Sequence, residues 1–433
     1  MKMYDIITKV KRREPLSREE IREVVFGYTR GEIPDYQISA LLMAICYSGL
    51  SDAEVRELTE AIADSGERLD LSQFGNLTVD KHSSGGVGDK TTLIVAPLAA
   101  ALGCKVAKMS GRGLGHTGGT VDKLESFPGY KTTLSREDFL SQVERIGIAV
   151  IGQSDSLAPA DKKLYALRDV TATVDSIPLI TSSIMGKKLS SGTRTIVLDV
   201  KYGSGAFMKT ADDAELLAKS MVNIGKMCGR NMAALITDMD TPLGLGIGNI
   251  IEVREAIEVL RGGGPSDLRE VCIAIAAELF SLSHSVAIPE AALMAKEALD
   301  SGAAYEKFVE WISAQGGDEK YARNPELLGE AKFKREVFAD RDGFVSRTDA
   351  EKIGLSSLSL GAGRLTKTDN IDLAAGIILD KKRGDRVSRG DRLATLYSND
   401  EKRLDSAEKT FISAYSFDEV KPEKTPVIHS IIR

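Results

Sequence analysis

The stretch LTVDKHSSGGVGDKTTLIVAPLAAAL, residues 77–102, joins a short apolar run to a longer one through a glycine-rich turn. Residues 77–80 are typical of a strand and residues 93–102 of a helix. Glycines at such a junction let backbone N–H groups converge, and the following helix adds the positive end of its dipole. The stretch therefore predicts a strand–turn–helix unit whose turn can bind a small anion.

Further apolar runs of strand length follow along the chain and alternate with helical stretches. They are CKVAKM (104–109), IAVIG (148–152), TIVLDV (195–200) and MAALITD (232–238). This alternation is the signature of an α/β domain with a largely parallel sheet.

The first 70 residues contain helical patterns and nothing typical of a strand. Ser17 and Glu20 form a capping box, a second helix follows Pro34, and Ser51 caps a third. Residues 159–190 also form two helical patterns, which we expect to return to the N-terminal helices. The expected domains are therefore a helical domain of residues 1–70 and 159–190, and an α/β domain of residues 71–158 and 191–335.

The residue pattern changes in the last part of the chain. Residues 314–334 are polar and resemble a linker, and residues 336–433 contain short strand patterns with Gly-Asp turns. The expected fold class is α/β: a small all-helical domain, a large α/β domain with a central mixed, largely parallel sheet, and a C-terminal α+β domain over residues 336–433.

Composition excludes several classes of function. A chain of 433 residues is long enough for two or three domains, and its net charge of −6 disfavours a general nucleic-acid binder. No signal peptide and no membrane-spanning run is found, so we expect a cytoplasmic protein with no membrane partner. The 4 cysteines lie far apart without a CxxC pair, which disfavours a zinc site or a disulfide framework.

A second loop, KMSGRGLGHTGGT (residues 108–120), again combines a lysine, hydroxyl groups and glycines after a strand pattern. Loops after sequential parallel strands meet at the carboxyl edge of the sheet, where α/β proteins bind ligands. Neither loop has the spacing of a Walker A or a dinucleotide motif. Together they predict one anion site, to which Lys81, Ser83 and Thr92 of the first loop would contribute a charge and hydroxyl donors.

Here the sequence resembles a known family. SGRGLGHTGGTVDKLE (110–125) is similar to the signature of the thymidine and pyrimidine-nucleoside phosphorylases. KHSSGGVGD (81–89), residues 151–188 and VLDVKYGSGAFMK (197–209) are similar to the same family. The resemblance covers nearly the whole chain. It implies reversible phosphorolysis of uridine, thymidine and/or 2′-deoxyuridine, with phosphate as co-substrate and no organic cofactor, by a homodimer assembled through the helical domains.

The resemblance also implies roles for individual residues. Arg168, Ser183 and Lys187 would bind the pyrimidine, Arg168 and Lys187 would polarise it, and His82 between phosphate and base would donate a proton or a hydrogen bond to the leaving base. His116 is expected to be structural, and Leu114 and Phe207 would pack against the nucleoside. The implied phosphate ligands are Lys81, Ser83, Thr92, Lys108, Ser110 and Thr120.

Some members of the family hold a monovalent cation, largely through backbone carbonyls. The matching positions here, which imply potassium, are Gly88, Lys90, Leu243, Gly246 and Glu255. Position 90 departs from the small hydroxyl residue that is usual there, and a lysine ammonium could compete with the ion, although a carbonyl ligand would survive the change.

Three other functions remain open. A thymidine-specific phosphorylase would share these motifs. A phosphoribosyltransferase of the anthranilate type has the same architecture but needs acidic residues for pyrophosphate and metal. A non-catalytic nucleoside sensor would have no need of His82 and of the paired cations Arg168 and Lys187.

Overall fold

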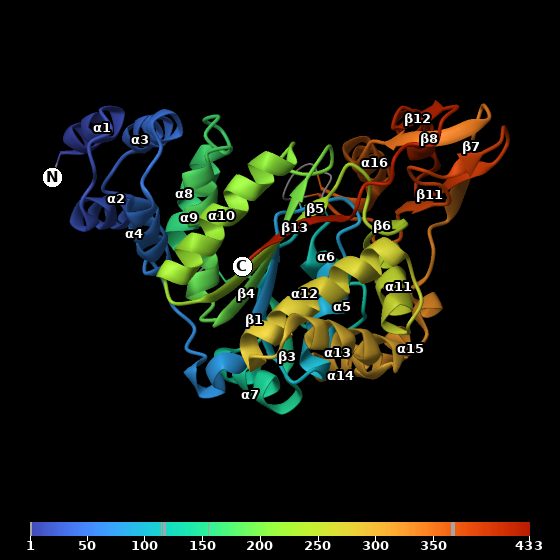
Figure 1. The fold of residues 1–433 in the computed structure, drawn as a ribbon, viewed down its shortest axis with the longest axis horizontal. Coiled ribbons are helices and arrows are strands. Elements are labelled where there is room, and N and C mark those ends of the chain that lie inside the picture. The colour runs from blue at the N-terminus through green and yellow to red at the C-terminus, as the bar shows by residue number, and fades with distance from the viewer. Residues whose placement is uncertain (1, 114, 116–117, 155, 365–368) are drawn as a thin grey trace.

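The computed structural model describes residues 2–113, 115, 118–154, 156–364 and 369–433. Four N-terminal helices lie at one end of the molecule and the C-terminal sheets at the other, with a large α/β unit between and below them (Figure 1). Leu114, His116 and Thr117 of the second glycine loop lie outside the described residues, so the predictions for Leu114 and His116 stay untested.

Three of the N-terminal helices begin where the sequence predicts, and α1 precedes them. They are α1 (Met3–Lys11), α2 (Arg18–Arg30), α3 (Asp35–Ser48) and α4 (Asp52–Ala63). Ser17 accepts a hydrogen bond from the Glu20 amide (3.2 Å) while the Glu20 carboxylate accepts one from the Ser17 amide (2.8 Å). Ser51 and Glu54 cap α4 in the same way. The capping box at Ser17 and the cap at Ser51 are thus confirmed.

The helices of the 159–190 segment do pack against this N-terminal group. They are α8 (Pro159–Arg168) and α9 (Ile177–Ser190). Leu164, Leu167 and Leu179 lie in one apolar cluster with residues of α1, α2 and α3. On its other side, α9 contributes Ile180 and Met185 to a cluster with the central sheet. α9 therefore contacts both the helical group and the α/β unit.

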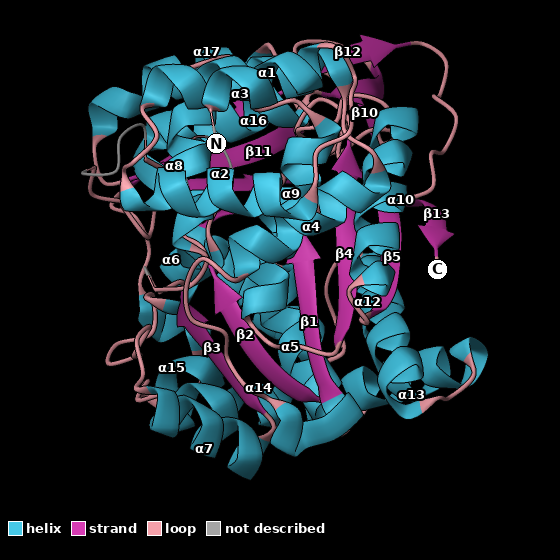
Figure 2. Ribbon diagram, turned by 90° about the vertical axis from the view of Figure 1, so that its left-hand side faces the viewer, coloured by secondary structure: helices cyan, strands magenta, loops and turns pink. Residues whose placement is uncertain are grey.

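The central sheet has the order β13-β5-β4-β1-β2-β3 over the described residues. Neighbouring strands from β5 to β3 are parallel, whereas β13 is antiparallel to β5, so the sheet is mixed and largely parallel as predicted. In Figure 2 the strands β1, β2 and β4 run side by side in one direction. Their bounds are β1 (Thr78–Ser83), β2 (Lys105–Ser110), β3 (Ile148–Gly152), β4 (Thr195–Tyr202), β5 (Asn231–Asp238) and β13 (Ile428–Ile432).

Helices cover both faces of this sheet, which explains why its strands are apolar without a polar face. Val197 of β4 packs in the cluster that holds α5 (Thr91–Ala101) and α12 (Ser266–His284). Its neighbours Ile196 and Leu198 pack with α10 (Ala211–Met227) on the opposite face. The other helices of this unit are α6 (Thr120–Leu124), α7 (Arg136–Ile146), α11 (Asn249–Leu260), α13 (Ile288–Asp300) and α14 (Ala303–Ala314).

The C-terminal region has two small sheets, of orders β10-β8-β12 and β6-β9-β11-β7 over the described residues. Its elements are β7 (Phe333–Phe338), β8 (Gly343–Thr348), α16 (Ala350–Ser357), β9 (Gly376–Leu379), β10 (Arg386–Val387), β11 (Arg392–Ser398), α17 (Leu404–Ile412) and β12 (Tyr415–Asp418). The α+β character is as expected.

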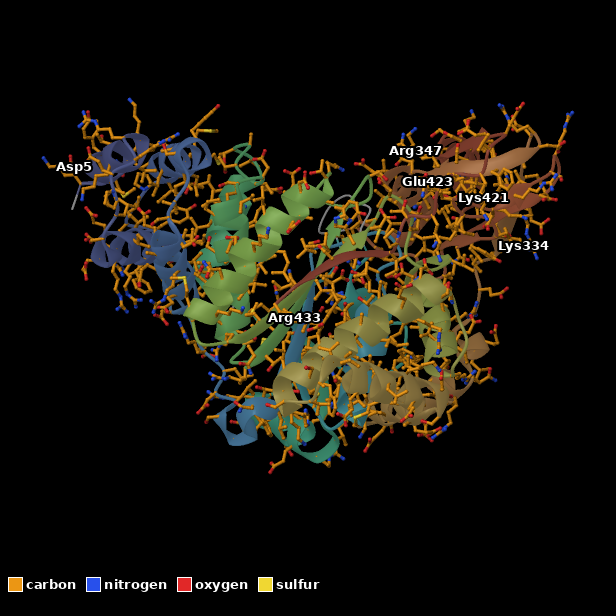
Figure 3. The ribbon with its side chains drawn as sticks, viewed as in Figure 1. Asp5, Lys334, Arg347, Lys421, Glu423 and Arg433 are labelled. Carbon is orange, nitrogen blue, oxygen red and sulfur yellow. The ribbon has the colours of Figure 1, made fainter. Side chains whose placement is uncertain are left out.

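Three features differ from the expectations or go beyond them. The expected linker holds α15 (Glu319–Arg323) and a 3₁₀ turn (Pro325–Leu328), and Ala322 in it is fully buried. The short strand β6 (Gly246–Gly248) pairs with β9 of the C-terminal region. β13 pairs with β5 of the central sheet, and Arg433 beyond it forms an ion pair with Glu278 of α12 (2.5 Å; Figure 3). Within the described part of the chain, none of the helices is long and apolar enough to cross a bilayer.

Candidate active site

The first glycine loop connects β1 to α5 and is held by Asp89. The Ser83 hydroxyl donates to the Asp89 carboxylate and accepts a hydrogen bond from the Gly85 amide (3.1 Å). Asp89 also accepts from the amide of Thr91, the first residue of α5 (3.2 Å). Gly88 has φ +73°, and a Cβ there would lie 2.5 Å from the Leu243 carbonyl oxygen. Only glycine therefore fits at position 88, where the loop passes close to another backbone segment.

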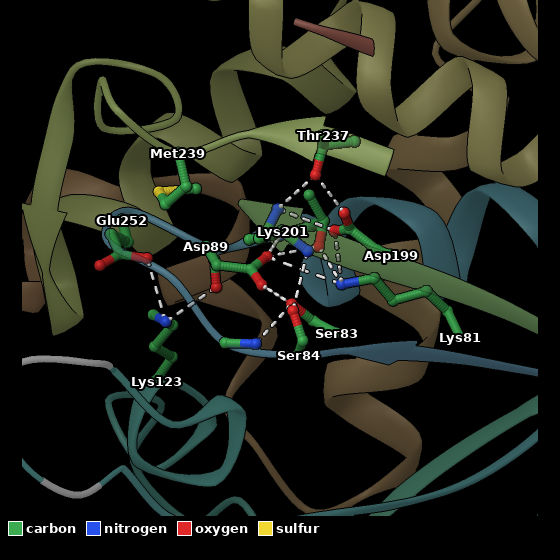
Figure 4. Close-up of polar contacts among 12 residues, drawn as sticks. Lys81, Ser83, Ser84, Asp89, Lys123, Asp199, Lys201, Thr237, Met239 and Glu252 are labelled. Atoms are coloured by element: carbon green, nitrogen blue, oxygen red, sulfur yellow. Dashed lines mark hydrogen bonds and ion pairs between the residues drawn. The ribbon is translucent and has the colours of Figure 1, made fainter. Parts of the chain in front are cut away.

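Lys81 lies in a buried network of alternating charges at the same edge (Figure 4). Its ammonium lies 3.5 Å from an Asp199 carboxylate oxygen and 3.6 Å from one of Asp89, and it also donates to the Thr91 hydroxyl. Lys201 forms a closer ion pair with Asp199 (2.9 Å). Burial alone would raise the pKa of Asp89, but the ammonium groups of Lys81 and Lys201 hold it well below its ordinary value. The Asp89 carboxylate therefore stays charged, and Lys81 lies between it and Asp199.

Lys108 on β2 belongs to a second buried cluster. The Asp80 carboxylate accepts from Lys108 through one oxygen (3.0 Å) and from Lys188 of α9 through the other (2.6 Å). Burial lowers the pKa of Lys108 to about 8, although Asp80 acts in the opposite direction. Lys188 was not among the predicted residues. The cluster joins β1 and β2 of the sheet to the helix that carries Lys187.

His82 lies between these groups. Burial lowers its pKa well below the ordinary value, and the nearby ammonium groups act in the same direction; they belong to Lys188, Lys108, Lys187 and Lys81. The imidazole is therefore neutral at pH 7 and can donate one ring N–H. In a chain with net charge −6, this group of lysines produces a local positive charge, which favours binding of an anion.

The second glycine loop starts at Ser110, the last residue of β2, which pairs with Gly152 of β3. It ends at Thr120, the first residue of α6. Arg364 of the C-terminal region reaches into this loop: its carbonyl accepts from the Gly115 amide (2.9 Å), and its guanidinium binds Asp122 (2.8 Å). Arg112 also forms an ion pair with Asp122 (3.2 Å), so it is neutralised locally.

Three of the predicted phosphate ligands, Lys81, Thr92 and Lys108, border one small cavity beneath α5, together with Asp80. The rest of its lining is apolar. Ser83 is engaged with Asp89. Ser110 and Thr120 lie at the two ends of the second loop.

The predicted base residues come together on α8 and α9. The Lys187 ammonium forms an ion pair with Asp161 (2.8 Å) and donates to the Ser183 hydroxyl (3.4 Å). Arg168, 3% exposed, donates to three backbone carbonyls, those of Thr173, Leu179 and Val174. Arg168, Ser183 and Asp161 border a mainly apolar pocket among the N-terminal helices. Phe207 lies elsewhere, after β4, and is 44% exposed.

Several residues of these networks were not predicted: Asp80, Asp161, Lys188, Asp199 and Lys201. Asp199 and Lys201 did carry a signal, because they are charged residues inside a strand whose neighbours are apolar on both faces. Lys188 gave no comparable signal, since a lysine on a helix is ordinarily solvated.

The positions expected to hold potassium do converge, but around a side chain. The Lys90 ammonium donates to the carbonyls of Leu243 (3.0 Å) and Gly246 (2.8 Å) and to the Glu255 carboxylate. Burial would lower the pKa of Lys90, but Glu255 and Glu252 outweigh it and raise the pKa above its ordinary value. The carbonyl and carboxylate oxygens expected to hold an ion are thus used by a permanent ammonium, and potassium does not fit there.

Comparison with protein families matches nearly the whole chain in three parts. Residues 4–66 match the helical bundle domain of a glycosyl transferase family, and residues 75–305 match the a/b domain of that family. Residues 344–418 match the pyrimidine nucleoside phosphorylase C-terminal domain.

Individual relatives agree with this result. The pyrimidine-nucleoside phosphorylase of Bacillus subtilis is 51% identical over 433 residues, which is 100% of both chains. That of Geobacillus stearothermophilus is 50% identical over 412 residues, 95% of each chain. The crystal structure of an anthranilate phosphoribosyltransferase from Thermus thermophilus has the same fold, with a TM-score of 0.59, 19% identity, and coverage of 71% of this chain and 98% of that one. The chain belongs to the pyrimidine-nucleoside phosphorylase family of glycosyltransferases.

Proposed function

We propose that the protein is a pyrimidine-nucleoside phosphorylase, a pentosyltransferase. It cleaves uridine, thymidine and/or 2′-deoxyuridine with phosphate and releases the free base and (deoxy)ribose 1-phosphate, reversibly, in nucleoside salvage or catabolism. The observation that carries the proposal is the position of His82. It follows Lys81 on β1, and the carboxylate of Asp80, two residues before it, binds Lys108 of the sheet and Lys188 of the helical side.

In this proposal the sheet edge binds phosphate. The ligands are Lys81, Ser83, Thr92, Lys108, Ser110 and Thr120, which supply ammonium and hydroxyl donors. Ser83 donates to Asp89 in the free protein. A bound phosphate would compete with Asp89 for this hydroxyl and for Lys81. The charge of the phosphate would also raise the pKa of His82, since it offsets the surrounding ammonium groups.

The helical side binds the base. A phosphate oxygen attacks C1′ of the sugar while the bond between C1′ and the base breaks, and the bonding electron pair leaves with the pyrimidine. Lys187 and Arg168 stabilise the negative charge that develops on the ring, and Ser183 orients it. Neutral His82 donates a hydrogen bond to the leaving base. Arg168 has five N–H donors, and three hydrogen bonds to backbone carbonyls orient its guanidinium.

We further propose the domain division given by the sequence, with residues 1–70 and 159–190 carrying the base and residues 71–158 and 191–335 carrying phosphate. Closure of the two would align the reactants and exclude water. A homodimer through the helical domain is supported by exposed aromatic side chains on neighbouring helices: Tyr4 of α1 is 76% exposed, and Tyr36 and Tyr47 of α3 are 74% and 81% exposed. We assign residues 336–433, the C-terminal α+β domain, a structural role. We place the enzyme in the cytoplasm and assign it no nucleic-acid or membrane partner.

The test is release of free base from uridine, thymidine and 2′-deoxyuridine, followed by ultraviolet absorbance with and without phosphate. We expect release only with phosphate, in step with sugar 1-phosphate. Activity on thymidine alone would identify a thymidine-specific phosphorylase. Formation of phosphoribosyl anthranilate from anthranilate and phosphoribosyl pyrophosphate would overturn the proposal, as would nucleoside binding by calorimetry without turnover in folded protein.

A further inference from the structure

Lys90 sits at a junction of three segments. It is the residue before α5, and its side chain reaches the loop before β6, the first residue of β6 and α11. All three hydrogens of the Lys90 ammonium group have an acceptor, because Leu243, Gly246 and Glu255 each accept one. The side chain is 0% exposed.

The Glu255 carboxylate and the loop around Lys90 are held in place by further contacts. The second oxygen of Glu255 accepts from the amides of Leu245 (2.7 Å) and Gly246 (3.1 Å). Gly244 has φ +71°, and a Cβ there would lie 3.0 Å from the Lys90 ammonium. The loop is therefore shaped closely around the ammonium group, and no space is left beside it.

This junction lies next to the proposed phosphate loop. Lys90 directly follows Asp89, which holds Ser83, and precedes Thr91 and Thr92. A second tether runs in parallel, because Lys123 donates to the Asp89 carbonyl (3.1 Å) and forms an ion pair with Glu252 of α11 (3.0 Å; Figure 4). Two buried ammonium groups thus connect the loop to α11.

We propose that the Lys90 ammonium is a built-in substitute for a monovalent cation: it positions the phosphate loop against α11 and makes the protein independent of potassium. The inference rests on the proposed function for its kinetic part only. Lys90 is a positioning residue, since it contacts no reactant. An exchangeable ion would leave the loop sensitive to salt composition, whereas a covalently attached cation does not.

The first experiment uses the unaltered protein. Its thermal midpoint and its apparent phosphate KM are measured in potassium chloride and in tetramethylammonium chloride at equal ionic strength. We expect both quantities to be the same in the two salts. A specific rise of the midpoint, or a drop in KM, with potassium would overturn the inference.

The second experiment removes the Lys90 ammonium group by substitution. In Lys90→Thr the oxygens of Leu243, Gly246 and Glu255 lose their donor, so the midpoint falls and the phosphate KM rises about ten-fold without potassium. Potassium, but not tetramethylammonium, should restore both. Lys90→Met, which fills the space without charge, should be damaged equally and not be rescued. Rescue of neither variant, or of both, would contradict the inference.

Failure of the proposed function can be distinguished from failure of the inference about Lys90. If the protein does not phosphorolyse nucleosides, the proposed function fails, but the thermal midpoints still decide whether Lys90 replaces an ion. If Lys90→Thr does not fold in either salt, the salt response of the unaltered protein still decides.

Discussion

Buried cations at the sheet edge and in the helical pocket are neutralised in different ways. Lys108 and Lys188 share the carboxylate of Asp80, whereas Arg168 donates to backbone carbonyls. A carboxylate cancels a full charge and is costly to lose, while carbonyl dipoles orient a cation and leave more of its charge available to a ligand. Lys108 and Lys188 are thus held by a carboxylate, whereas Arg168 keeps more of its charge available to a ligand.

The largest expected effect comes from breaking the scaffold. Asp80→Asn leaves two buried ammonium groups without a counter-charge, so the free energy of unfolding should fall by about 3–5 kcal/mol. Urea unfolding measures this. The control is Asp380→Asn, whose carboxylate pairs with Arg392 at the surface and should contribute at most about 1 kcal/mol. Equal losses in both variants would contradict the comparison.

The next largest expected effect is a loss of turnover on the helical side of the site. Lys187→Ala removes a cation that stabilises the departing base, so turnover should fall about 100-fold with little change in phosphate KM. Steady-state kinetics on uridine test this, with Lys219→Ala, an exposed side chain of α10, as a control. Near-normal turnover would remove Lys187 from the proposed site.

A smaller change should affect only the phosphate side. Ser110→Ala deletes one hydroxyl donor from the second loop, so the apparent phosphate KM should rise about ten-fold. The KM for the nucleoside serves as an internal reference and should stay constant. If the two KM values rise together, Ser110 shapes the whole site instead of binding phosphate.

The smallest effect is a pH dependence. Since the pKa of Lys108 is about 8 in the free protein, its ammonium is present below that pH and is lost above it. Phosphate affinity should therefore weaken as pH rises from 7 to 9, and binding should take up protons in that range. Calorimetry in buffers of different ionisation enthalpy measures the uptake. A flat affinity across this range would mean that Lys108 does not contact phosphate.

Much of the fold could be predicted because its signals are local. Capping boxes at Ser17 and Ser51, apolar runs for the parallel strands and glycines between strand and helix each depend on neighbours in sequence. The partners of β13 and β6 could not be predicted in this way. β13 pairs with a strand about 190 residues away, and β6 has only three residues, Gly-Ile-Gly.

The candidate site also combines features that depend on local sequence with features that depend on distant segments. The sequence by itself indicated which residues lie on the two glycine loops and on α8 and α9. Backbone conformation at a turn and the face of a helix follow from short-range geometry. Only the tertiary structure decided which charges meet: Asp80 with Lys188, Asp199 with Lys81, and Lys90 with Glu255. Such pairs form when distant segments exclude water together, and a buried charge then requires a partner that spacing along the chain does not reveal.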